Sequence, residues 1–100
     1  MITRIFRVRI DPLKRAEFEA DFATISVDAV TSQRGFISVE VGKPTHWTPD
    51  EYAMITRWSD EQSLRDFVGE SWNEAHIPEG MEGYVQECWV HHYKDYESQK

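Results

Sequence analysis

The residues best suited to chemistry lie close together in the segment ESWNEAHIPEG, between positions 70 and 80. Trp72 and His76 are four residues apart, so a helix would place both side chains on one face. An imidazole near a helix C-terminus can act as a general base or as a metal ligand, and an indole beside it gives a planar ligand an apolar wall. The spacing therefore predicts His76 as the catalytic candidate and Trp72 as a substrate-binding residue. The alternative is a histidine that only bonds the last carbonyls of the helix.

Four further residues complete the candidate site. Asn73 carries an amide that would donate a hydrogen bond to a substrate oxygen, although its spacing places it beside the predicted face rather than on it. Phe67 and Trp58 would add aromatic walls, unless they belong to an ordinary core. Arg7, on a predicted strand, would stabilise an enolate or a propionate if it faced a pocket. Its alternative role is an ion pair with a carboxylate at a rim or an interface.

The remaining histidines and the single cysteine do not form a metal site. His91 and His92 are adjacent on a predicted strand, so one should face the helices and the other the opposite side of the sheet. His46 lies in a loop that we expect at the surface or at a dimer rim. The sequence contains no H-E-x-x-H spacing and no glycine-rich phosphate loop. With Cys88 alone, neither an internal disulfide nor a cysteine-based zinc site can form. We therefore expect no protein-bound metal and no nucleotide cofactor.

The composition narrows the class of partner. The 100 residues are 40% hydrophobic and 13% aromatic, which is too apolar for a disordered segment. The formal charge of −7 arises in the second half, where four Lys or Arg face eleven Asp or Glu, against seven of each in the first half. An acidic surface repels phosphate groups, so nucleic acid and anionic membranes are not expected partners. Without an apolar run of about 18 residues or a signal-like N-terminus, the chain is predicted to be cytoplasmic.

The elements that must position these residues follow from periodicity and caps. Apolar residues alternate with polar ones in the predicted strands, and Asp11-Pro12 supplies a cap and a first residue for a helix. Ser59 is the expected cap of a second helix, with Gln62 completing a capping box. The expected elements are strands at 2–10, 36–43, 51–58 and 84–94, a helix at 13–32, a helix after Ser59 that weakens at Gly69, and a shorter helix at 70–80.

This order, β-α-β-β-α-β, predicts a ferredoxin-like α+β fold in which helices cover one face of a four-stranded antiparallel sheet. We expect a single domain over residues 1–94, followed by a frayed tail at 95–100. Two helices cover only one face, yet Ile5, Ile55 and Trp89 add apolar side chains to the other. A homodimer with its two sheets face to face would cover them. The alternative is that these residues are exposed singly.

The stretch EYAMITRWSDEQSLRDF followed by WNEAH, with RGFISVEVGKP before it, resembles the antibiotic biosynthesis monooxygenase (ABM) superfamily of dimeric α+β barrels. The resemblance spans residues 2 to 93 and implies a homodimer with a pocket between the helices and the sheet of each subunit. It also implies a small aromatic or quinol-type substrate and a reaction with O2 that needs no cofactor.

The resemblance extends to haem-degrading members of the superfamily, which use a His, a Trp and an Asn. His76 falls at the position of the His, Phe67 at that of the Trp and Arg7 at that of the Asn, so one of the three is kept. Three hypotheses follow: a cofactor-independent monooxygenase with His76 as base, a haem-binding or haem-degrading protein with His76 as ligand, and a non-catalytic ligand-binding or stress-response relative.

Overall fold

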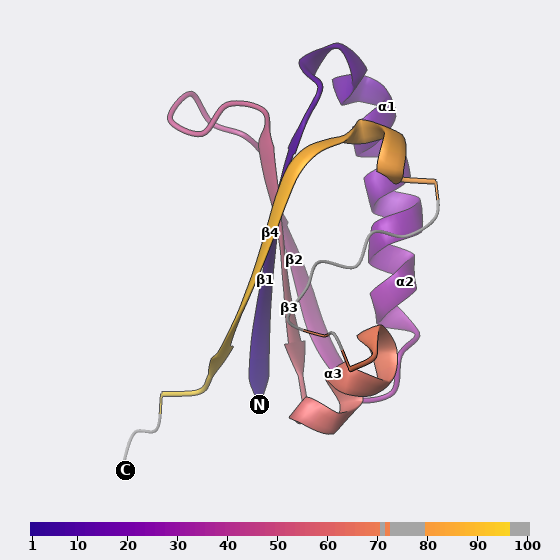
Figure 1. Ribbon diagram of the computed structural model, residues 1–100, viewed down its shortest axis with the longest axis vertical. Helices are drawn as coiled ribbons and strands as arrows, with labels where there is room; N and C mark the ends of the chain where they lie inside the picture. The colour runs from indigo at the N-terminus through magenta and orange to yellow at the C-terminus, as the bar shows by residue number, and fades with distance from the viewer. Residues whose placement is uncertain (71, 73–79, 97–100) are drawn as a thin grey trace.

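The computed structural model describes residues 1–70, 72 and 80–96, so the predictions made for Asn73 and His76 lie outside the described residues. The predicted β-α-β-β-α-β order is confirmed (Figure 1). The strands are β1 (Ile2–Ile10), β2 (Phe36–Gly42), β3 (Glu51–Trp58) and β4 (Val85–Lys94); the helical segments are η1 (Pro12–Lys14), α1 (Arg15–Asp21), η2 (Phe22–Ser26), α2 (Val27–Thr31), α3 (Glu61–Val68) and η3 (Glu82–Tyr84). Within the described ranges, no helix is both long enough and apolar enough to cross a membrane.

The four strands form one antiparallel sheet in the order β2-β3-β1-β4. The long helical segment, which runs from η1 through α1 and η2 to α2, lies against the same side of this sheet as α3 (Figure 1). Along β1, every even-numbered residue from Ile2 to Ile10 is buried and every odd-numbered one is partly exposed. The even positions therefore face the helices, and we call the other side of the sheet the open face. This alternation is the period of two that the sequence predicts.

The first helical segment is longer and less regular than one α-helix. Asp11 caps it, because its carboxylate accepts a hydrogen bond of 3.0 Å from the backbone N–H of Leu13. One π turn, η2, separates α1 from α2. The buried residues of this segment recur every four positions, at Phe18, Phe22, Ser26 and Val30. A regular helix of about 3.6 residues per turn would rotate them off one face, and the wider π turn offsets that drift.

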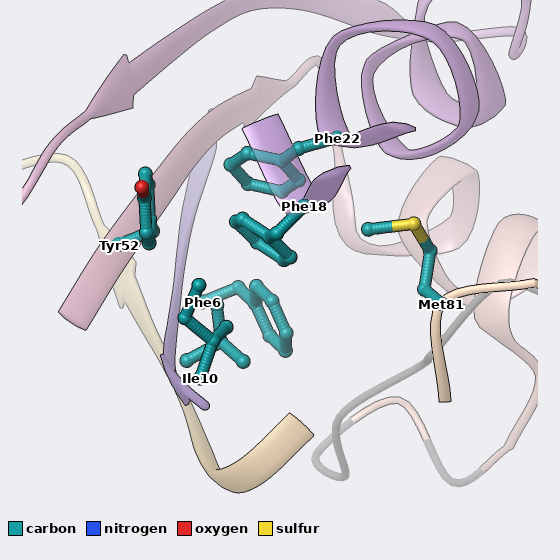
Figure 2. Packing of buried hydrophobic residues seen from close by; sticks show 7 residues of the cluster. Phe6, Ile10, Phe18, Phe22, Tyr52 and Met81 are labelled. Carbon is teal, nitrogen blue, oxygen red and sulfur yellow. The ribbon is translucent and has the colours of Figure 1, made fainter. Parts of the chain in front are cut away.

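Two hydrophobic clusters fill the space between sheet and helices. The first cluster consists of Phe6, Val8, Ile10, Phe18, Phe22, Tyr52 and Met81. In Figure 2, the rings of Phe18 and Phe22 stack with centroids 4.9 Å apart, and Met81 closes the cluster on the side away from Tyr52. The second cluster consists of Ile2, Val30, Trp58 and Leu64, and it lies where α3 meets the sheet. The core is thus divided along the strands into two apolar regions.

The start of α3 differs from the sequence prediction by one residue. Asp60, not Ser59, is the cap, and its carboxylate accepts a hydrogen bond of 2.8 Å from the N–H of Ser63. A carboxylate competes well for this position, and the hydrogen bond holds the pKa of Asp60 below its usual value. The helix ends as predicted at Gly69, whose φ of 87° is in the region that favours glycine.

Candidate functional site

One row of polar side chains crosses the helix-covered face of the sheet between the two clusters. Thr56 on β3 and His92 on β4 are the register partners of Arg4 on β1, and we call these three residues the polar row. Along β1, Arg4 lies between Ile2 of the second cluster and Phe6 of the first cluster. Because β-strand side chains alternate, all three members of the row point toward the helices. A cationic side chain is therefore built into an otherwise apolar layer.

Arg4 is held in place by contacts with two other elements. Its side chain is 5% exposed, and its Nη1 donates hydrogen bonds of 2.8 Å to the backbone carbonyl of Trp72 and 2.9 Å to Nε2 of His92. Burial lowers the pKa of Arg4 to about 10, so the guanidinium remains protonated near neutral pH. Arg4 thus attaches the start of the segment that carries His76 to the middle of the sheet.

His92 is neutral at physiological pH. Its pKa is lowered to about 4, first by burial and then by the positive charge of Arg4 and by His91. An arginine N–H can only donate, so Nε2 of His92 must accept and the ring proton must lie on Nδ1. The indole of Trp72 meets this imidazole edge to face, with ring centroids 4.7 Å apart. The two histidines face opposite sides of the sheet, as the sequence predicts, and His92 is the one that faces the helices.

One of the predicted aromatic walls, Trp58, is part of the core. Trp58 is fully buried, stacks on Phe67 at a centroid distance of 5.4 Å and donates a hydrogen bond of 2.9 Å from Nε1 to the hydroxyl of Thr56. Trp58 therefore stabilises the polar row through its hydrogen bond to Thr56 and does not present a surface to a ligand. Phe67 is half-buried on α3 and Trp72 is half-buried beside His92, so these two rings are the more accessible ones.

Arg7 lies on the open face, away from the polar row. Its guanidinium pairs with Glu51 at 3.7 Å and lies over the indole of Trp89, 5.1 Å from the ring centroid. The geometry therefore matches the ion pair that the sequence analysis gave as the alternative role of Arg7. The structure does not bring Arg7 together with Trp72.

A groove of about 270 Å³ lies away from the polar row, between the long helical segment and the strands β2 and β3. Its polar lining is already paired: Tyr52 donates a hydrogen bond of 2.5 Å to Glu19, and Lys43 and Arg15 each pair with Glu19 at 3.3 Å. Burial, followed by this hydrogen bond, raises the pKa of Tyr52 to about 12. These groups stabilise the junction between α1, β3 and the residue after β2. Among the described residues, no group of three or more His, Cys, Asp or Glu could hold a metal ion.

Sequence reasoning missed Arg4. The signal was present, because Arg4 occupies an even position in β1, between apolar Ile2 and Phe6 on the same face. A charged residue at such a position is rarely buried without a specific role. The sequence could not supply the contact with Trp72, which is 68 residues away.

Comparison with known proteins agrees with this architecture. A family model described as "Antibiotic biosynthesis monooxygenase" matches residues 1–88. No curated protein sequence matches the chain.

Solved structures resemble the fold at low identity. MhuD from Mycobacterium tuberculosis, a heme-degrader with two hemes bound in its active site, is 14% identical over the full length of both chains, with a TM-score of 0.71. SnoaB from Streptomyces nogalater, a cofactor-independent oxygenase, is 16% identical with a TM-score of 0.71, covering 97% of this chain and 94% of its own. A conserved protein from Methanosarcina mazei Go1 is 17% identical with a TM-score of 0.73, covering 95% and 92%. At these identities the likeness concerns the fold alone.

Proposed function

Because the chain belongs to the antibiotic biosynthesis monooxygenase family, we propose that it is a dimeric, cofactor-independent oxygenase that acts on an aromatic or quinol-type small molecule with O2. The similarity in fold to SnoaB, itself a cofactor-independent oxygenase, supports this choice within the family. The proposed site lies between the sheet and the helices, with His76 as base and Trp72 as a wall.

The observation that carries this proposal is the polar row. An enzyme of this type needs an apolar space for aromatic rings together with a few polar groups that orient one oxygen and control its charge. The row supplies a buried guanidinium and a neutral imidazole, with the apolar residues of the two clusters on either side. Trp72 bonds to this row through its carbonyl, and His76 follows four residues later in the chain.

The proposed reaction draws its reducing power from the substrate. His76 removes a proton from a carbon or hydroxyl group that is activated by aromatic rings, as in an anthrone, and the resulting carbanion passes an electron to O2. Recombination of the two radicals forms a hydroperoxide on the substrate carbon, and loss of water leaves a carbonyl. One oxygen atom enters the product, and the other leaves as water with the two hydrogens of the original methylene. Neither a metal nor an organic cofactor takes part in this sequence.

The open face supports the dimeric part of the proposal. Ile5 pairs with Ile55 across β1 and β3, and Trp89 lies nearby on β4, all of them partly exposed. The charged side chains next to these residues are paired, Arg7 with Glu51 at 3.7 Å and Arg57 with Glu40 at 3.6 Å, so no uncompensated charge from these pairs would be buried on association. A second copy of the same face is the partner that we propose.

The described residues do not favour haem as the ligand. The resemblance puts Arg7 and Phe67 where haem-degrading members have Asn and Trp, but Arg7 faces the open side of the sheet and Phe67 stacks on buried Trp58. Haem remains the relevant control, because the heme-degrader MhuD shares the fold.

The proposal is tested by oxygen uptake with anthrones and quinols, in buffer freed of metals by chelator. The wild-type protein should consume O2 faster than the spontaneous reaction, and His76→Ala should lower the enzymatic rate at least about 100-fold, as expected for loss of a general base. His46→Ala is the matched control, since His46 is exposed in the loop before β3 and should leave the rate unchanged. Equal rates for wild type and His76→Ala would refute the catalytic role.

A further inference from the structure

We propose that Arg4, positioned by His92, binds the ionised oxygen of an aromatic ligand, whether phenolate, enolate or carboxylate. This inference rests on the proposed function for placing the ligand between the sheet and the helices. The polar row would then recognise the negative charge of the ligand. His92 would not touch the ligand but would hold the guanidinium of Arg4 in position.

The geometry of Arg4 suits this role. Both hydrogen bonds described above leave from Nη1, one to the carbonyl of Trp72 and one to His92, and together they fix the plane of the guanidinium. A planar guanidinium that is fixed in this way recognises an oxyanion through paired N–H groups, with little entropy lost on binding. A ligand oxygen would add to, or exchange with, the partners that Arg4 already has.

The charge of the row also suits an anion. His92 accepts a hydrogen bond from Arg4 without carrying a charge of its own, so the pair holds one positive charge at a site with little contact to water. In such surroundings a cation attracts an anion more strongly than it would in bulk water. A ligand with an ionised oxygen should therefore be preferred over its neutral analogue.

The neighbouring residues suit the remainder of an aromatic ligand. The next row along the sheet consists of Met54, Phe6 and Val90, which are register partners on β3, β1 and β4. Met54 and Val90 are half-buried and border the first cluster. A charged row beside an apolar row matches a molecule with one ionised group at the end of a planar ring system. On the other side of the polar row, Trp72 meets His92 edge to face and packs against the second cluster.

The competing explanation is that Arg4 is purely structural and only fastens Trp72 to the sheet. Both explanations predict that a change at Arg4 matters, so stability alone does not separate them. They differ in selectivity: a structural Arg4 affects charged and neutral ligands alike, whereas a binding Arg4 affects only the charged one. The experiment therefore compares naphthoate with naphthalene methanol, which differ in charge while sharing the same rings.

Calorimetry should show that the wild-type protein binds naphthoate at least about ten-fold more tightly than naphthalene methanol, a difference expected for a charge-assisted pair. Arg4→Met should remove this preference and leave naphthalene methanol within about two-fold of wild type. His92→Gln, which keeps an acceptor for Arg4, should retain the preference, and His92→Phe should reduce it. Arg34→Met, at an exposed position in the turn before β2, is the control and should change neither ligand.

Three results would overturn the inference. They are a wild-type protein without preference for naphthoate, an Arg4→Met protein that retains the preference, and an Arg4→Met protein that loses both ligands equally while remaining folded by circular dichroism. If Arg4→Met does not fold, Arg4→Lys takes its place, and it should lower the preference because an ammonium lacks the planar fork. Since naphthoate is not oxidised, these measurements do not depend on turnover. Intact naphthoate binding without any oxygen uptake would contradict the proposed function and leave this inference standing.

Discussion

Acidification should destabilise the folded chain through His92, and the effect can be worked from its surroundings. The imidazole is partly buried and accepts a hydrogen bond from Arg4. Burial first, and then the positive charge of Arg4, lowers its pKa to about 4 in the fold. In the unfolded chain its pKa should be near the usual 6.5. Between these two values the unfolded state binds a proton that the folded state does not, so stability falls as the pH falls from about 6.5 to about 4. Above that range His92 contributes no pH dependence, because it is neutral in both states.

At pH 5 the two pKa values would favour the unfolded state by about 2 kcal/mol. Because His92 is only half-buried, solvent screens part of this effect, and we expect about 1 kcal/mol. His92→Gln provides the comparison, because glutamine offers Arg4 an acceptor oxygen but does not titrate. The other titrating groups are common to both proteins and cancel in the difference.

The assay is urea unfolding of wild type and His92→Gln at about pH 7.5 and about pH 5, followed by tryptophan fluorescence. Wild type should lose about 1 kcal/mol more than His92→Gln over this interval. His91→Gln removes only the smallest of the three influences on the pKa of His92, so it should lose nearly as much stability as wild type over this interval. Identical pH dependence for wild type and His92→Gln would show that burial and the charge of Arg4 do not hold His92 neutral, and the description of the polar row would be wrong.

Three further predictions concern the dimer, the packing of α3 and haem. Sedimentation should give a dimer for wild type at tens of micromolar and a monomer for Ile55→Glu, which puts a charge on the open face. Ala20→Glu, on the exposed surface of α1, is the control and should remain dimeric. A monomeric wild type would contradict the role of the open face. Gly35→Ala should lower the free energy of unfolding by about 2 kcal/mol, because Gly35 has a φ of 82° and a methyl group there would collide with Ser63. Gly83 has open space around it, so Gly83→Ala is the control and should change the free energy of unfolding by no more than about 0.5 kcal/mol. Haemin titration should give no Soret shift that depends on His76; a shift abolished by His76→Ala would favour the haem hypothesis instead.

Much of the fold follows from local sequence patterns. The alternation in β1 and β3, the Asp11-Pro12 start and the Gly69 end are encoded by neighbouring residues, and the structure confirms them. The cap of α3 was misplaced because Ser59 and Asp60 are both good caps, and only the helix geometry decides between them. The π turn of η2 has no simple residue signature, although the spacing of four between buried residues is consistent with it.

The candidate site was less accessible to sequence reasoning. The prediction for Trp72 as a wall relied on a helix containing His76, and only Trp72 falls within the described residues. The contacts that matter most join β1, β4 and Trp72, which are separated by 68 and 88 positions, and no local pattern encodes such pairings. The resemblance pointed to the position of Arg7, and Arg4 was not considered. The alternation along β1 places Arg4 toward the helices and Arg7 on the open face.

The central claim, that the protein inserts one atom of O2 into an aromatic substrate without a cofactor, is tested most directly with isotopically labelled dioxygen. Metal-free protein is incubated with an anthrone under labelled O2, and the product is analysed by mass spectrometry. The account predicts a quinone that carries one labelled oxygen atom and forms faster than in buffer, with that excess lost in His76→Ala. A product without label, or one that forms no faster than in buffer, would contradict it.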